Sequence, residues 1–189
     1  MQCNDKKTQV KGHQMKRYHP VLVTLHWLLA AMVIGGLVMG GQVLAKTPNA
    51  DPAKLFSLRM HMSIGIIILV LMVARLVIRI ATKKPPHADI GNDLLNTGAI
   101  GAHYLLYGVV IAMGASGLAI ANAAGLPAIV FGGSGEALPA DFNDIAPRAA
   151  HGILALLLKL VIAGHVLASL YHQYVRKDSL FSRMWYGDR

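Results

Sequence analysis

Four apolar runs in this sequence are each long enough to cross a lipid bilayer. They lie at about residues 20–45, 57–81, 98–122 and 149–175, and a transmembrane helix needs about 20 predominantly apolar residues. Charged residues make up only 14% of the chain, whereas about a quarter of the residues of a soluble domain are charged. We therefore predict an all-α integral membrane protein, a four-helix bundle formed as one domain by residues 20–176.

Two polar tails, residues 1–19 and 177–189, flank this domain. The first apolar run follows the N-terminal tail and exceeds the about 7–15 apolar residues of a signal-peptide core, so we predict that it is retained as a membrane anchor. Cys3 is the only cysteine, which excludes a disulfide or a thiolate metal cluster within one chain.

The basic residues indicate how the spans are oriented. Cytoplasmic loops carry an excess of Lys and Arg, so we predict that both termini lie in the cytoplasm and that the long connection 123–147 is a flexible acidic loop on the outer side. No nucleic-acid partner is needed to explain the net charge of +9. The predicted cytoplasmic side carries Lys6, Lys7, Lys11, Lys16, Arg17, Arg79, Lys83, Lys84, Arg176, Lys177, Arg183 and Arg189, and the outer side carries Lys46, Lys54, Arg59 and Arg148.

Histidines recur inside the predicted spans, where ionisable side chains are rare and usually functional. For any one of them the alternative is a neutral imidazole that is hydrogen-bonded to a neighbouring helix. The histidines in or at the end of a span are His26, His61, His103, His151, His165 and His172.

The predicted orientation places four of these histidines at two depths. His61 and His151 lie near the start of inward-running helices and so near the outer face, whereas His26 and His165 lie in the inner half. His151 and His165 are fourteen residues apart, about 21 Å along one helix and on nearly the same face. His61 and Arg75 have the same spacing, which indicates two stacked sites.

Each of these sites contains an imidazole pair without a carboxylate or a thiolate beside it. Haem iron suits axial histidine ligands, whereas zinc would more typically need four ligands that include a carboxylate or a thiolate. We therefore predict two haem b groups. Iron with two axial histidines has no open position, so it moves electrons and does not bind oxygen. A haem-free transporter that uses its histidines for protons or metal is an alternative hypothesis.

The chain resembles the bacterial di-haem cytochrome b561 family from about residue 18 to residue 184. Four stretches carry the resemblance in order: TLHWLLA, HMSIGIIILVLMVARLVIR, HYLLYGVVIAMGASG, and H-x13-H-x6-H followed by KDSLFSRM. It implies His26 with His165 as ligands of the inner haem and His61 with His151 as ligands of the outer haem. Arg75 is implied as a propionate partner.

The same resemblance implies a multi-pass protein of the bacterial inner membrane that carries electrons between the periplasmic face and membrane quinone. Some family members oxidise superoxide while they reduce ubiquinone, so superoxide and a periplasmic redox protein are alternative donors. A cytochrome b subunit of a larger dehydrogenase or hydrogenase remains the alternative function. Membrane lipid is a partner in either case, and a homodimer stays open.

Three further residues in the spans leave their roles open. His172, near the inner end of the fourth span, is predicted to lie on the quinone side, because a histidine near neutral pKa can pass protons to a quinone. His103 lies at the depth of the inner pair, where it is an alternative ligand or a partner of the cofactor. Lys159, midway between His151 and His165, matches no family pattern. It is open whether it pairs with a propionate, tunes the haem potential, or extends along the helix or into a small polar pocket.

Overall fold

The computed structural model describes residues 17–86, 91–178 and 180–187, and every regular element in these ranges is helical. Residues 1–16 of the predicted N-terminal tail lie outside the described residues. In chain order the elements are α1 (Pro20–Val38), π-helical η1 (Met39–Leu44), α2 (Pro52–Ala81), α3 (Asp93–Ala123), α4 (Leu126–Val130), α5 (Ala146–Leu170), π-helical η2 (Tyr171–Arg176) and 3-10 helix η3 (Phe181–Met184).

Four of these helices are long and apolar enough to cross a membrane, which confirms the predicted fold class. They are Pro20–Leu44, Pro52–Ala81, Asp93–Ala123 and Ala146–Arg176. Three of the four begin several residues before the predicted apolar run, and polar caps start two of these, α2 and α3, outside the apolar segment. Asp51 and Asn92 each accept a hydrogen bond from a backbone N–H in the first turn, as N-cap residues do.

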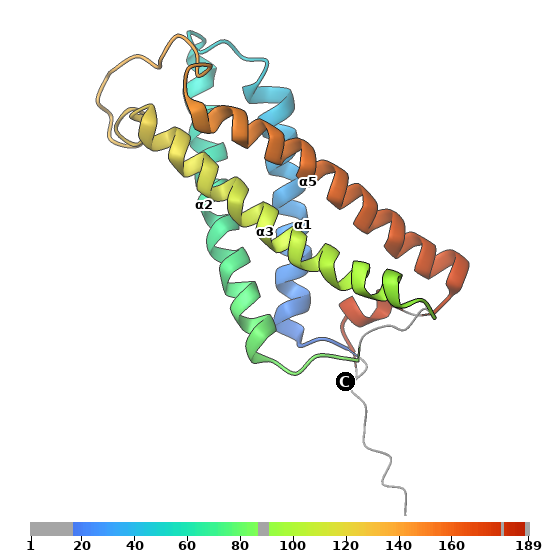
Figure 1. The fold of residues 1–189 in the computed structure, drawn as a ribbon. Helices are drawn as coiled ribbons and strands as arrows, with labels where there is room; N and C mark the ends of the chain where they lie inside the picture. Colours follow the sequence, from blue (N-terminus) through green and yellow to red (C-terminus); the bar gives the residue numbers. More distant parts are fainter. Residues whose placement is uncertain (1–16, 87–90, 179, 188–189) are drawn as a thin grey trace, which may run out of the picture.

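The four long helices form an antiparallel bundle in which α3 and α5 cross in front of α1 and α2 (Figure 1). We call the end where α1 begins and η2 ends the terminal end, and the opposite end the far end. Neighbouring helices pack closely in the order α1, α2, α3, α5, whereas α1 and α5 approach each other much less. The bundle is therefore less tightly closed between its first and last helices.

The protein core lies between the long helices, and the outer surface is apolar. One buried cluster fills the middle of the bundle: Leu29, Val33, Met72, Tyr107, Val109, Val110 and Leu158. Large apolar side chains on the outside, such as Ile80, Ile153 and Leu160, keep 69%, 69% and 62% of their surface exposed. A continuous exposed apolar surface of this kind faces lipid in a membrane protein.

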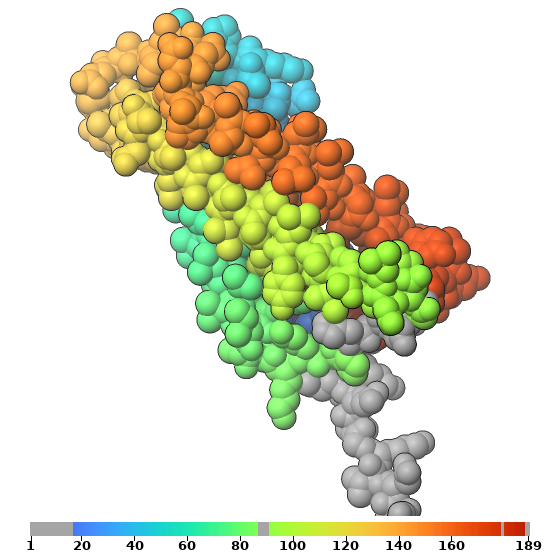
Figure 2. Space-filling view, in the orientation of Figure 1, coloured from blue at the N-terminus to red at the C-terminus, as the bar shows by residue number. Residues whose placement is uncertain are grey.

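The connection between α3 and α5 is partly folded against the far end of the bundle. Helix α4 begins after Gly125, whose positive φ of 63° ends α3 in a tight turn. Val130 is fully buried, and Arg59 donates a hydrogen bond to the Val130 carbonyl at 2.9 Å. Figure 2 shows residues 124–145 gathered beside the start of α5. The prediction of a flexible loop over 123–147 was therefore wrong for residues 126–130, where the apolar sequence LPAIV buries a short helix.

The contact between α2 and α3 depends on a glycine. A methyl group at Gly114 would lie 3.0–3.2 Å from the Leu69 side chain, including Cβ, whereas a methyl group at Gly108 on the same helix would meet nothing within 4 Å. Because Cβ is fixed to the backbone, the two helices would have to separate. We expect Gly114→Ala to lower the unfolding temperature in detergent and Gly108→Ala to preserve or raise it, since alanine favours a helix by about 1 kcal/mol over glycine. Equal effects of the two substitutions would contradict this packing.

Candidate redox-cofactor sites

The terminal half of the bundle brings together His26 from α1 and His165 from α5. Their ring centres lie 6.2 Å apart with an angle of 69° between the ring planes. Both side chains are half-buried. We call these two residues the terminal pair, and the sequence analysis had selected them as one of its two pairs.

The far half of the bundle contains a second pair with nearly the same geometry. The ring centres of His61 on α2 and His151 on α5 lie 6.3 Å apart, and their planes make an angle of 76°. These residues are also half-buried, and we call them the far pair. Helix α5 thus contributes one histidine to each pair, while α1 and α2 contribute the others.

Two glycines give the far pair its space. A methyl group at Gly40 would lie 3.3 Å from Cε1 of His61, and one at Gly117 would lie 3.5 Å from Cε1 of His151. Gly40 belongs to the π-helical segment η1, and π-bulges inside helices are frequent at functional sites. The sequence MGGQVL therefore both widens the end of α1 and leaves room beside an imidazole.

The Nδ1 atoms of the far pair have different partners. Nδ1 of His151 lies 2.9 Å from the Ser116 hydroxyl. Nδ1 of His61 is buried and has no hydrogen-bond partner among the described residues. A hydrogen bond at Nδ1 fixes the orientation of an imidazole and directs its Nε2 outward, which is how metal-binding histidines are usually held.

Two buried arginines lie near the terminal pair. Arg75 donates a hydrogen bond to the Tyr107 hydroxyl, and its Nη2 lies 3.5 Å from Nδ1 of His26. Arg79 lies over the ring of Tyr18, with its guanidinium carbon 5.7 Å from the ring centre. Nε of each arginine has no partner among the described residues. Because buried cations need an anion, these two arginines indicate an anionic group at this end.

His103 lies beside the terminal pair but is held in another way. Its ring centre is 5.5 Å from that of His165, and its Nδ1 lies 2.6 Å from the Ala99 carbonyl of its own helix. The structure thus brings three histidines together at this depth. Among the described residues, no backbone group forms a hydrogen bond with the ring of His26 or His165, which distinguishes these two from His103.

The last predicted site residue, His172, lies in the π-helical segment η2 at the terminal end. Its Nδ1 is 2.5 Å from a carboxylate oxygen of Asp178, which Arg176 also approaches at 3.6 Å. Burial acts to raise the pKa of Asp178, but the hydrogen bonds from His172 and Leu180 and the charge of Arg176 outweigh it and lower that pKa. Asp178 is therefore ionised at neutral pH and forms a dyad with His172.

The C-terminal segment packs across the terminal end, next to the terminal pair. Trp27 donates a hydrogen bond to the Met184 carbonyl at 2.9 Å, and its ring contacts those of Phe181 and Trp185. On its other side Trp27 lies 5.2 Å from the His26 ring centre. The segment therefore shields one side of the terminal pair with aromatic rings.

The cations predicted near the outer site have separate structural roles. Lys54 is 5% exposed and donates hydrogen bonds to the carbonyls of Leu44 and Thr47 at 2.5 and 2.6 Å, so it closes the connection between α1 and α2. Arg59 holds α4, as described above. Arg148 lines a surface depression at the start of α5.

Both histidine pairs fit a metal centre with two axial imidazoles. Two rings that each place a nitrogen about 2 Å from one metal ion have centres about 6 Å apart, close to the 6.2 and 6.3 Å observed. The sequence has no Asp or Glu between residues 94 and 135 or between 52 and 81, so carboxylate ligands are not available there. Fold and site together define the class of a membrane cytochrome b.

Comparison with known proteins agrees with this class. The family model for prokaryotic cytochrome b561 matches residues 17–187. A probable superoxide oxidase, CybB, from Yersinia pestis is 30% identical over 172 residues, covering 89% of this chain and 96% of the relative. Cytochrome b562 from Cereibacter sphaeroides is 29% identical, covering 88% and 94%, and cytochrome b561 homolog 2 from Escherichia coli is 28% identical, covering 89% and 91%.

The chain belongs to the prokaryotic cytochrome b561 family, as its sequence motifs had predicted. Membership implies haem b as the cofactor and electron transfer in the membrane as the general function. Together with the four membrane-spanning helices, it makes the protein a multi-pass protein of the bacterial inner membrane.

Several residues near the pairs were not found from the sequence. Tyr107 and Ser116 were missed because a lone hydroxyl in an apolar span gives no periodic signal. Arg79 was counted only as a cytoplasmic charge, although it is 6% exposed. Asp178 directly follows the basic residues at the end of the fourth span, and the KDSLFSRM motif was the signal that could have identified it.

The two adjacent glycines of η1 provide a test of the far pair. Alanine at position 40 would press on the His61 ring, whereas alanine at position 41 would meet nothing within 4 Å. We expect Gly40→Ala to lower the haem content or shift the α-band of the reduced absorption spectrum, because the ring must move by a few tenths of an ångström. Gly41→Ala is the matched control and should retain the wild-type spectrum. Identical spectra for both variants would show that His61 is not held against a cofactor at this position.

Proposed function

We propose that this protein holds two haem b groups, one at the terminal pair and one at the far pair, and passes electrons from the periplasmic face to membrane quinone. The observation that carries the proposal is the repeated geometry, since two separate imidazole pairs share a spacing of 6.2–6.3 Å and an angle of 69–76°. Each haem supplies one-electron exchange at its iron when bound. The chain supplies the ligands, the spacing and the local charge.

The terminal end is the cytoplasmic end in this proposal. Excess Lys and Arg mark cytoplasmic segments, and twelve of the eighteen basic residues precede α1, end or follow α2, or follow α5. The terminal pair then belongs to the inner haem and the far pair to the outer haem. An electron would travel inward from the far pair to the terminal pair along α5.

Arg75 is proposed to bind a propionate of the inner haem. A guanidinium can only donate hydrogen bonds, so Nδ1 of His26 accepts in its contact with Arg75. A histidine that binds metal through Nε2 instead carries a proton on Nδ1 and donates it. Arg75 would then need another acceptor, and the haem carries carboxylates whereas the spans around Arg75 do not.

Superoxide is the proposed donor, a suggestion supported by the relative from Yersinia pestis, which is named as a probable superoxide oxidase. Two superoxide anions would be oxidised to two molecules of oxygen at the far end. Their two electrons, with two protons, would reduce one quinone to quinol at the terminal end, with ubiquinone as the proposed acceptor. Arg148 lines an open depression at the far end and is the cation proposed to attract the anion, whereas Lys54 and Arg59 are directed at backbone carbonyls.

His172 and Asp178 are the proposed route for the protons. An imidazole can pass protons to a quinone, and the Asp178 carboxylate, 2.5 Å from Nδ1 of His172, orients its ring. The dyad lies at the end of η2, beyond the terminal pair. A quinone headgroup at this level of the membrane would be close to both the inner haem and water.

The ratio of haem to protein tests the two-site assignment. We expect a ratio near two in the purified protein, near one in either His61→Ala or His26→Ala, and near zero in the double variant, because each pair loses one axial ligand. Pyridine haemochrome absorbance with a protein assay measures this ratio. His103→Ala is the control and should retain two haems.

A ratio that stays at two in His61→Ala would reject the far pair as ligands. Loss of haem in His103→Ala, with retention in His26→Ala, would instead assign the terminal site to His103 and His165.

Stopped-flow mixing with superoxide tests the donor. We expect the reduced haem absorption band to appear on mixing, in a reaction whose rate falls as salt is added, since Arg148 at the far end would attract the anion electrostatically. If the haem stays oxidised with superoxide yet is reduced by dithionite, superoxide is not the donor. A partner protein would then supply the electrons, as for a subunit of a larger complex.

The proton route is tested in a second mixing step with a ubiquinone analogue. We expect His172→Gln to slow haem reoxidation by at least about 10-fold, because positioned proton transfer contributes about 10²–10⁴-fold to a rate. Reduction by superoxide should keep its wild-type rate in the same variant. If both half-reactions keep their wild-type rates, the dyad is not part of the route.

A further inference from the structure

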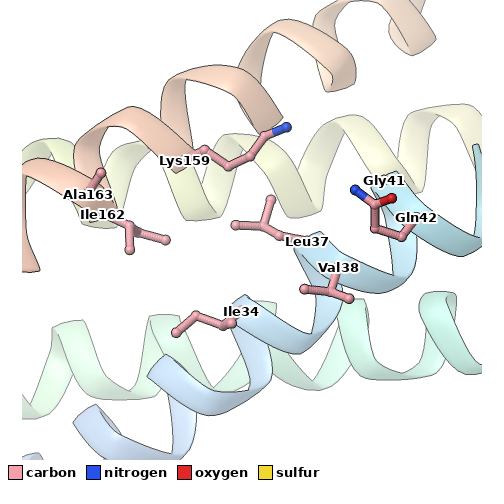
Figure 3. A pocket seen from close by; sticks show the side chains of 8 residues that line it. All are labelled: Ile34, Leu37, Val38, Gly41, Gln42, Lys159, Ile162 and Ala163. Atoms are coloured by element: carbon pink, nitrogen blue, oxygen red, sulfur yellow. The ribbon is translucent and has the colours of Figure 1, made fainter.

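A groove opens on the lipid-facing side between α1 and α5, where these two helices are least closely packed. It has a volume of about 330 Å³ and is lined by Ile34, Leu37, Val38, Gly41, Gln42, Lys159, Ile162 and Ala163 (Figure 3). Apart from Lys159 and Gln42, all its lining residues are apolar. A groove of this composition in a membrane protein would be filled by lipid if it held no charge.

Lys159 places an ammonium group in this groove without an anion. Within the described ranges it makes no hydrogen bond and no ion pair. Its own span has no Asp or Glu from residue 145 to residue 177. Lysine inside a membrane is rare and normally pairs with a partner or lines a polar site, so an anion from beyond the described residues would complete its pairing.

Gln42 adds hydrogen-bond donors on the opposite wall of the groove. Its side-chain oxygen accepts a hydrogen bond from the Lys46 ammonium at 2.6 Å, which leaves the amide nitrogen as its available end. Figure 3 shows the Lys159 side chain extending toward Gly41 and Gln42 and away from Ile162 and Ala163. The groove therefore presents donors from both η1 and α5 at the same end.

This polar end of the groove adjoins the far pair. Gly41 lines the groove, and its neighbour Gly40 lies against the His61 ring, where a methyl group would be 3.3 Å from Cε1. Lys159 follows His151 by eight residues on α5, about 12 Å along the helix axis. His165 lies nearer along the axis, six residues or about 9 Å beyond Lys159, but the Lys159 side chain extends toward Gly41 and Gln42 (Figure 3). A cofactor held by His61 and His151 would therefore lie on the side that the ammonium faces.

We propose that the Lys159 ammonium, with the Gln42 amide, binds a propionate carboxylate of the outer haem at the open side of the bundle. The inference rests on the proposed function, because it needs a haem at the far pair. The charges are complementary, since the groove offers hydrogen-bond donors and one positive charge while a haem propionate is an anion. Lys159 is then a positioning residue that also sets the reduction potential of the outer haem.

Redox titration of Lys159→Met tests the proposal in the complete protein. A nearby cation disfavours ferric haem, which carries one more positive charge than ferrous haem, so its removal should lower the midpoint potential of the outer haem alone. Lys159→Arg should restore the potential, because it restores the charge. Lys84→Met, which removes a charge from the connection between α2 and α3, is the control for net charge and should leave both potentials unchanged.

The two haems are distinguished by titrating Lys159→Met in two backgrounds. Lys159→Met should lower the midpoint potential in the His26→Ala background, which retains the outer haem. It should leave the midpoint potential unchanged in the His61→Ala background, which retains the inner haem. Loss of one haem from Lys159→Met would equally support the proposal if Lys159→Arg keeps both haems. The contact with the propionate carboxylate would then be needed to retain the outer haem.

Several results would overturn the inference. With two haems bound, unchanged potentials in Lys159→Met would show that no propionate lies at Lys159, and a raised KM for quinone in the same variant would assign the groove to a quinone. Equal shifts of both potentials, or a shift that arginine does not restore, would indicate a general structural effect. A wild-type protein with fewer than two haems would instead contradict the proposed function itself.

Discussion

The distance between paired imidazoles is the constraint on which the arrangement of the bundle depends. Side-chain packing joins α1 to α2, α2 to α3 and α3 to α5, but it leaves α1 and α5 poorly connected. The terminal pair lies across this weak contact, because His26 is on α1 and His165 is on α5. If a metal ion bridges these rings, a coordinate bond replaces the apolar contacts that most helix pairs in a membrane use for association.

Much of the fold and of the two pairs could be predicted from the sequence, for a physical reason. A bilayer fixes the length and direction of each span, so residue number converts to depth. Depth paired His61 with His151 and His26 with His165, although it left His103 as an alternative at the inner level. The geometry of these residues agrees with that selection, while their role as ligands remains a proposal. Depth does not determine the direction in which a side chain faces around its helix axis. The structure adds this information and shows which side chains face each other.

The elements that were missed are those whose form depends on tertiary contacts. Helix α4 is only five residues long and exists because Val130 and its neighbours pack against the far end. The π-helical segments η1 and η2 carry no distinctive sequence pattern, yet they contain Gly40 and His172 respectively. The partners of Arg75 and Lys54 likewise lie on other elements, at distances along the chain that periodicity does not report.

The position of α5 in the chain has a consequence for how the protein matures. Each histidine pair takes one member from α5, the last of the four long helices to leave the ribosome. Neither pair is complete until the whole bundle has been inserted, and the C-terminal segment that packs on Trp27 follows later still. Cofactor loading would therefore be a late event in biogenesis, and a chain truncated before α5 could anchor in the membrane yet offer no complete pair to a haem.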